Sequence, residues 1–118
     1  MRPTWDEYFR DMAKLVATRA TCPRASVGAV LVRDTQVLAS GYNGVASGRP
    51  HCSEVGCTIV DNHCLHSIHA EINVIGQAAR RGVSTDGATM YIHGLPPCPN
   101  CEKAMLAAGI KGWIYDPS

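Results

Sequence analysis

The first part of the chain alternates between a helical and a strand-like distribution of apolar positions. A capping box, Thr4 with Glu7 three residues later, precedes a stretch in which apolar side chains recur at helical spacing. The side chains of this stripe, which we expect to lie in the core, are Trp5, Tyr8, Phe9, Met12, Leu15 and Val16. Residues 26–44 then read as two strands joined by a turn near Asp34 and Thr35. The first of them is apolar enough for burial on both faces.

The second part of the chain continues this alternation of helices and strands. A helical pattern over residues 68–81 stops at Gly82, and a strand over residues 88–94 follows the next turn. Residues 98–108 form another helical pattern before a glycine, and residues 111–115 a short last strand. The order of elements predicts an α/β sandwich, in which helices cover the faces of one sheet.

Residues 44–66 show no clear period. Loops longer than about 12–15 residues are uncommon in compact domains and usually carry a function or a cross-link. This stretch concentrates metal-binding side chains, namely His51, Cys52, Cys57, His63, Cys64 and His66. A metal ion bound by some of them would offset the entropy lost when so long a loop is ordered.

Composition limits the classes of protein to which the chain can belong. The 118 residues form one domain by length, 46% of them are hydrophobic, and the formal net charge is +1. This charge gives no bulk attraction to nucleic acid, no apolar run is long enough to span a bilayer, and the first residues are polar. We therefore expect a cytoplasmic protein, in which six cysteines indicate metal binding or catalysis rather than disulfides.

The segment PPCPNC places two cysteines at the start of the helix over residues 98–108. Cys98 and Cys101 are three residues apart and so share one face, as two zinc ligands would. His69, at the start of the preceding helix, is the candidate third ligand. Three protein ligands leave one position for water, whose pKa a zinc ion lowers toward about 7. Glu71 is close enough to His69 to exchange protons with that water without being a ligand itself.

The segments HAEINVI and PCPNC together resemble the cytidine and deoxycytidylate deaminase superfamily, whose signature is H-x-E followed by P-C-x-x-C. The upstream segment TCPRASVGAVLVRDTQVLASGYNG is similar to the deoxycytidylate deaminases in particular. The resemblance covers roughly residues 5–115. It implies a three-layer α-β-α sandwich with a central mixed sheet, in a single deaminase domain over residues 1–118.

The resemblance also implies an activity. The chain would be a zinc-dependent hydrolase that deaminates dCMP, a free pyrimidine nucleotide, to dUMP, with Glu71 moving the protons. Asn43 matches a family position that contacts the sugar, and Ala70 matches one that packs beside the base. Family members assemble as dimers, trimers or hexamers, so the resemblance implies a homo-oligomer.

A second, structural zinc is implied by the segment HCSEVGCTIVDNHCLHSIHAE, which resembles the bacterial branch of the family. The cysteines that could bind it are Cys22, Cys52, Cys57 and Cys64. His63 or His66 could replace one of these thiolates, and the alternative is that the thiols are reduced and packed as small apolar groups.

Two further functions remain open at this level. The chain could deaminate another free or modified nucleoside or a base in RNA, since transfer-RNA adenosine deaminases share the cysteine spacing. It could also be a zinc-binding module without catalysis. The presence of Glu71 beside an intact ligand set disfavours this last reading, because a module that only binds zinc does not need the carboxylate.

Overall fold

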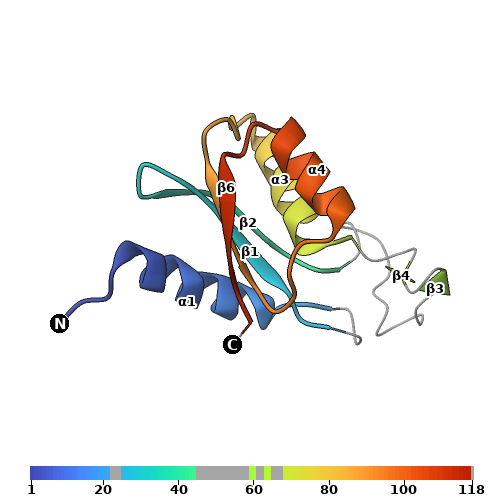
Figure 1. Ribbon diagram of the computed structural model, residues 1–118, viewed down its shortest axis with the longest axis horizontal. Helices are drawn as coiled ribbons and strands as arrows, with labels where there is room; N and C mark the ends of the chain where they lie inside the picture. The colour runs from blue at the N-terminus through green and yellow to red at the C-terminus, as the bar shows by residue number, and fades with distance from the viewer. Residues whose placement is uncertain (22–24, 45–58, 61–62, 65–67, 118) are drawn as a thin grey trace.

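The computed structural model describes residues 1–21, 25–44, 59–60, 63–64 and 68–117. Within them a four-stranded sheet separates α1 on one face from α3 and α4 on the other (Figure 1). The elements are α1 (Trp5–Ala17), β1 (Gly28–Arg33), β2 (Gln36–Tyr42), β3 (Ile59–Val60), β4 (His63–Cys64), α3 (Ala70–Arg81), β5 (Thr89–His93), α4 (Pro99–Ala107) and β6 (Gly112–Asp116). The three-layer α-β-α sandwich is therefore confirmed.

The sheet has the order β2-β1-β5-β6 and mixes two kinds of pairing. β1 pairs antiparallel with β2 and with β5, and β5 pairs parallel with β6 through the α4 crossover. β1 lies in the middle and is buried over Gly28–Val32, as its continuous apolar run predicts. The turn after it holds Asp34 and Thr35 at φ values of 53° and 60°, which suit the tight hairpins that follow the twist of paired strands.

Alternating side chains of the strands form two cores, one on each face of the sheet. On the α3 and α4 face, Leu31, Met90 and Ile92 pack against the buried stripe of α3, which includes Val74. On the α1 face, Val30, Val32 and Tyr91 pack against α1. The turns after α3 and α4 place Gly82 and Gly109 at positive φ, so both glycines mark the helix ends that the sequence predicts.

The prediction that Trp5 lies in the core is wrong. Trp5 stacks on Phe9 with ring centroids 5.7 Å apart but keeps 58% of its surface exposed, and Leu15 is 69% exposed. The reason is how closely α1 lies on the sheet: a Cβ added at Gly28 would be 2.2 Å from the Ala13 carbonyl oxygen. Phe9, Ala13 and Ala17 form the narrow buried stripe, which leaves the larger side chains at its margin.

The stretch that the sequence marks as a loop contains some regular structure. β3 and β4 pair antiparallel as a two-stranded ribbon, and Gly44 forms an isolated bridge with Ile68. Strands of two residues are too short to produce a period, which is why the sequence pattern misses them. None of the helices in the described ranges is long and apolar enough to cross a bilayer.

Candidate metal centre

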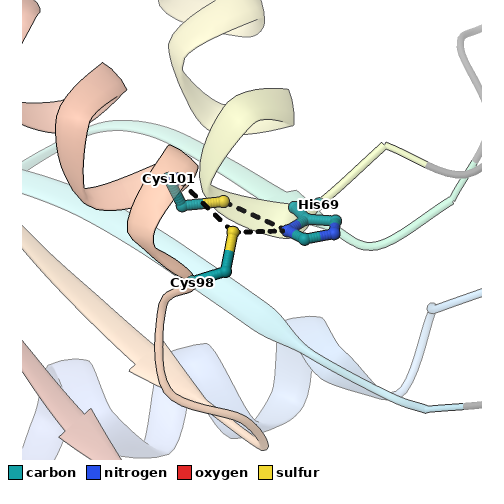
Figure 2. Close-up of side chains that lie close together, drawn as sticks. All are labelled: His69, Cys98 and Cys101. Carbon is teal, nitrogen blue, oxygen red and sulfur yellow. Dashed lines mark hydrogen bonds between the residues drawn. The ribbon is translucent and has the colours of Figure 1, made fainter. Parts of the chain in front are cut away.

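Three of the predicted ligands lie together where α3 and α4 begin. The Nδ1 atom of His69 is 3.1 Å from the Cys101 sulfur and 3.5 Å from the Cys98 sulfur (Figure 2). All three ligand atoms lie within 4.8 Å of one another. The structure thus brings together two segments that are about thirty residues apart in the sequence, as the expected three-ligand site requires.

The positions of the ligands follow from the helix starts. His69 is the N-cap of α3 and Cys98 is the N-cap of α4, and both have extended backbone angles that turn the chain into the helix. The Cys98 sulfur accepts a hydrogen bond from the Cys101 backbone N–H at 3.4 Å. Pro99 occupies the first turn, where its missing N–H costs nothing. The ligands come together because α3 and α4 begin next to each other in the fold.

The arrangement fits a tetrahedral zinc ion. With Zn–S bonds of about 2.3 Å and Zn–N bonds of about 2.0–2.1 Å, tetrahedral geometry separates sulfur and nitrogen by about 3.6 Å. The two distances from the His69 nitrogen are slightly shorter than this, so small shifts would admit the ion. One imidazole and two thiolates also leave one tetrahedral position for water or substrate, as in catalytic zinc sites.

The electrostatics of the site favour a bound cation. Burial raises the pKa of the Cys101 thiol, and the Glu71 carboxylate and Cys98 raise it further. The buried Cys101 thiol and the half-buried Cys98 thiol, beside the buried Glu71 carboxyl group, need a positive charge nearby before all three can ionise.

Glu71 lies in the first turn of α3 and is only 3% exposed. Its pKa is raised by burial, while its own backbone N–H, His69 and Cys101 each act to lower it. A carboxyl group in such surroundings takes up and gives back a proton nearer to neutral pH than an exposed one does. The structure therefore places a buried carboxyl group beside the metal ligands His69 and Cys101.

Asn43 and Ala70, the two predicted substrate contacts, are both buried. Asn43 accepts a hydrogen bond from the Val27 N–H and donates one to the Ala25 carbonyl oxygen, each at 2.8 Å. Counted over the described residues, one further N–H and one lone pair of the amide are left for another partner. Ala70 is 1% exposed and packs in the core under α3.

Most of the ligands predicted for a second zinc lie outside the residues that the structure describes. Cys22, Cys52, Cys57 and His66 lie outside the described residues, and His63 and Cys64 are described only as backbone in β4.

Sequence reasoning missed Asn73, which lies on α3 one turn after His69. Its side chain donates a hydrogen bond of 2.8 Å to the Tyr42 carbonyl oxygen at the end of β2. A signal was present, because Asn73 interrupts the apolar run between Ile72 and Val74. Tyr42, however, lies 31 residues away in the sequence, so this contact becomes visible only in the fold.

A hollow of about 540 Å³ opens beside the metal ligands. Among the described residues, Ile68, Ile72, Pro99 and Asn100 line it together with the three ligands. This volume is within the range of small-molecule sites.

Comparison with known proteins identifies the class to which this fold and site belong. Residues 3–116 match the family model described as the cytidine and deoxycytidylate deaminase zinc-binding region. The chain is a member of this family, and its His69, Cys98 and Cys101 site supports one zinc ion.

Two curated proteins are similar to most of this chain. The chain is 47% identical over 114 residues to ComE operon protein 2 of Bacillus subtilis, covering 97% of this chain and 60% of that protein. It is 38% identical to the deoxycytidylate deaminase of Schizosaccharomyces pombe, covering 99% of this chain and 38% of the relative. The chain therefore spans less than two thirds of either relative.

A solved structure shows the same fold. The dCMP deaminase from the cyanophage S-TIM5, in complex with dCMP and dUMP, superposes with a TM-score of 0.81 at 33% identity. The match covers 98% of this chain and 82% of that one.

Proposed function

We propose that this protein deaminates dCMP hydrolytically: dCMP and water give dUMP and ammonia. The observation that carries this proposal is the three-ligand site with the buried Glu71 beside it. The similarity to a cyanophage enzyme solved with dCMP and dUMP supports the choice of substrate. A single deaminase domain over residues 1–118 would carry the activity.

In the proposed mechanism, His69, Cys98 and Cys101 would hold a zinc ion, which when bound would act as a Lewis acid and lower the pKa of a water molecule. Glu71 accepts a proton from that water as the oxygen adds to C4 of the cytosine. The same carboxyl group then delivers that proton to N3, accepts the remaining proton of the new C4 hydroxyl group and passes it to the amine, as the bond between C4 and the amine breaks and ammonia leaves. The raised pKa of Glu71 suits a group that must both accept and release protons.

Asn43 and Ala70 would position the nucleotide. The spare N–H and lone pair of the Asn43 amide would bind the sugar, while its two hydrogen bonds to backbone keep the side chain rigid. Ala70 would pack beside the base and offer its backbone groups, since it directly follows the ligand His69.

Three further features belong to the proposal. Cys22, Cys52, Cys57 and Cys64, with His63 or His66 as a substitute ligand, would bind a second, structural zinc ion. The protein would act in the cytoplasm on a free nucleotide, and as a homo-oligomer. Metal analysis tests the first feature, because the proposal expects two zinc ions per chain.

The substrate is tested by measuring ammonia release from dCMP, CMP, deoxycytidine, cytosine, guanine and an RNA stem-loop on zinc-loaded protein. We expect turnover of dCMP above all others. Full zinc occupancy with no dCMP turnover would contradict the proposed substrate and leave the other compounds to identify the right one.

The role of Glu71 is tested by Glu71→Gln. We expect kcat to fall by about 10²–10⁴-fold, because proton transfer is lost, with the zinc content unchanged. Glu102→Gln is the matched control, since Glu102 is also in the first turn of a helix at this site but is partly exposed. Activity that survives Glu71→Gln would show that the protein does not act as this hydrolase.

A further inference from the structure

One amide side chain bridges the end of β2 and the segment that leads into α3. The Nδ2 atom of Asn73 is 2.8 Å from the Tyr42 carbonyl oxygen, 3.4 Å from that of Ile68 and 3.5 Å from that of Gly44. An amide nitrogen carries two hydrogens, so the geometry is one short hydrogen bond and two longer contacts. All three acceptors are backbone oxygens. The Asn73 amide therefore fixes the position of the backbone and not that of another side chain.

The backbone that Asn73 contacts carries the groups of the proposed site. Tyr42 and Gly44 lie on either side of Asn43, and Ile68 directly precedes His69. Gly44 and Ile68 also bond to each other, with N–H···O distances of 3.1 Å and 2.7 Å. Asn73 therefore lies where residues 42–44, which include Asn43, meet the segment that carries His69.

Asn73 also holds the metal ligand itself. Its backbone N–H donates to the His69 carbonyl oxygen at 3.0 Å, as the first turn of α3 requires. Its side chain meanwhile contacts the carbonyl oxygen of Ile68. The peptide groups before and after His69 are thus both in contact with Asn73, one through its side chain and one through its backbone, so the orientation of the imidazole depends on where Asn73 lies.

We propose that Asn73 is a positioning residue, whose side-chain amide sets the placement of His69 and of Asn43 relative to one another. The claim about His69 concerns metal binding alone. The claim about Asn43 rests on the proposed function, because it assumes that Asn43 contacts the nucleotide. Groups that orient a metal ligand typically contribute 10–100-fold to metal affinity or activity.

The first variant is Asn73→Asp, which keeps the shape of the side chain but replaces the N–H donors by a carboxylate facing three carbonyl oxygens. At 25 °C we expect zinc to leave the protein about 10–100-fold faster in the presence of a chelator. We expect KM for dCMP to rise while kcat per bound zinc changes much less, because Glu71 is untouched.

The matched control is Gln77→Glu, the same amide-to-acid change one turn further from His69 on the same helix. It introduces the same charge into α3 without removing the contact to Tyr42, so zinc release and KM should stay near those of the unmodified protein. Asn73→Ala is the second variant, which removes the amide without adding charge and should show the same changes in the same direction.

The outcomes separate this proposal from its alternatives. If the Asn73 variants lower Tm while zinc release and KM remain within twofold of the unmodified protein, the residue is only structural and the proposal is overturned. If the unmodified protein does not turn over dCMP, the proposed function fails, yet the zinc-release measurement still decides whether Asn73 positions His69.

Discussion

The two faces of the sheet differ in the size of their cores and in what they support: one packs against the helices that begin at the metal ligands, and the other packs against α1. Among the described residues, twelve buried side chains form the core under α3 and α4, whereas five form the core under α1. The larger core fixes two helices whose first residues carry His69 and Cys98. The smaller core combines an alanine-lined helix with an aromatic cluster and contributes none of the three metal ligands. Changes on the first face should therefore alter the chemistry, and changes on the second should alter stability alone.

The largest effect is expected from removing a ligand. Cys98→Ser and Cys98→Ala should both lose the zinc ion of this site and reduce activity to background, because the two remaining protein ligands do not hold the ion. The two variants should differ in the stability of the metal-free protein, because serine is a good N-cap residue and alanine is not. Metal analysis and denaturant unfolding after chelation measure both effects, and the serine variant should be about 0.5–2 kcal/mol more stable. Zinc retention at full stoichiometry in either variant would contradict the assignment of Cys98.

A pair of glycines tests the comparison between the two faces directly. A Cβ at Gly28 would lie 2.2 Å from the Ala13 carbonyl oxygen in α1, whereas a Cβ at Gly41 would lie 2.9 Å from the Val74 nitrogen in α3. Gly28→Ala should cost at least about 1–3 kcal/mol of unfolding free energy, since backbone has to move. The folded fraction should keep its zinc and its KM.

Gly41→Ala should cost less stability but should disturb the metal site. Its nearest contacts include the Ala70 carbonyl oxygen at 3.2 Å, in the residue that follows His69. We expect faster zinc release from Gly41→Ala than from Gly28→Ala, measured with the same chelator. Faster zinc release from Gly28→Ala than from Gly41→Ala would contradict the conclusion that only the α3 and α4 face supports the metal site.

The smallest effect concerns a hydroxyl on the α1 face. The Tyr91 hydroxyl donates a hydrogen bond of 2.5 Å to an Asp6 carboxylate oxygen. Burial, followed by that hydrogen bond and the charge of Asp6, raises the pKa of Tyr91 to about 12 from 10.0. Because the folded state holds this proton more tightly than the unfolded state, its contribution is complete below pH 10 and is lost as the pH rises through 12.

Tyr91→Phe should therefore make Tm less dependent on pH between about 9 and 12, as measured by thermal unfolding across that range. At pH 8 the variant should lose about 1 kcal/mol with the hydrogen bond. Its zinc content should match that of the unmodified protein, since Tyr91 lies on the face away from the ligands. Loss of zinc would show that the two faces are coupled.

The sequence predicted those parts of the molecule whose signals are local. The hydrophobic period, the caps and the turn residues predict the seven helices and strands of the sandwich. The pair Cys98 and Cys101 is visible because the two residues are close in the sequence. Sequence reasoning failed where the answer depends on tertiary distance. Trp5 belongs to the apolar stripe of α1, but how much of that stripe is covered depends on how closely Ala13 approaches the sheet. Asn73 gives a polar interruption in a helix, and only the fold shows which carbonyl oxygens it meets.

The strand order of the sheet has a consequence for how the chain folds. The β1–β2 hairpin joins neighbouring residues and closes quickly, whereas β1 and β5 are separated by the whole of residues 34–88. Loop closure of that length is slow and is repaid only when the distant strand docks. In the sequence, His69 lies before β5, and Cys98 and Cys101 lie after it. The three ligands therefore come together only when β5 has docked on β1. The metal pocket is therefore expected to be among the last parts of the protein to form, so zinc binds the finished fold and slows its unfolding more than it speeds its folding.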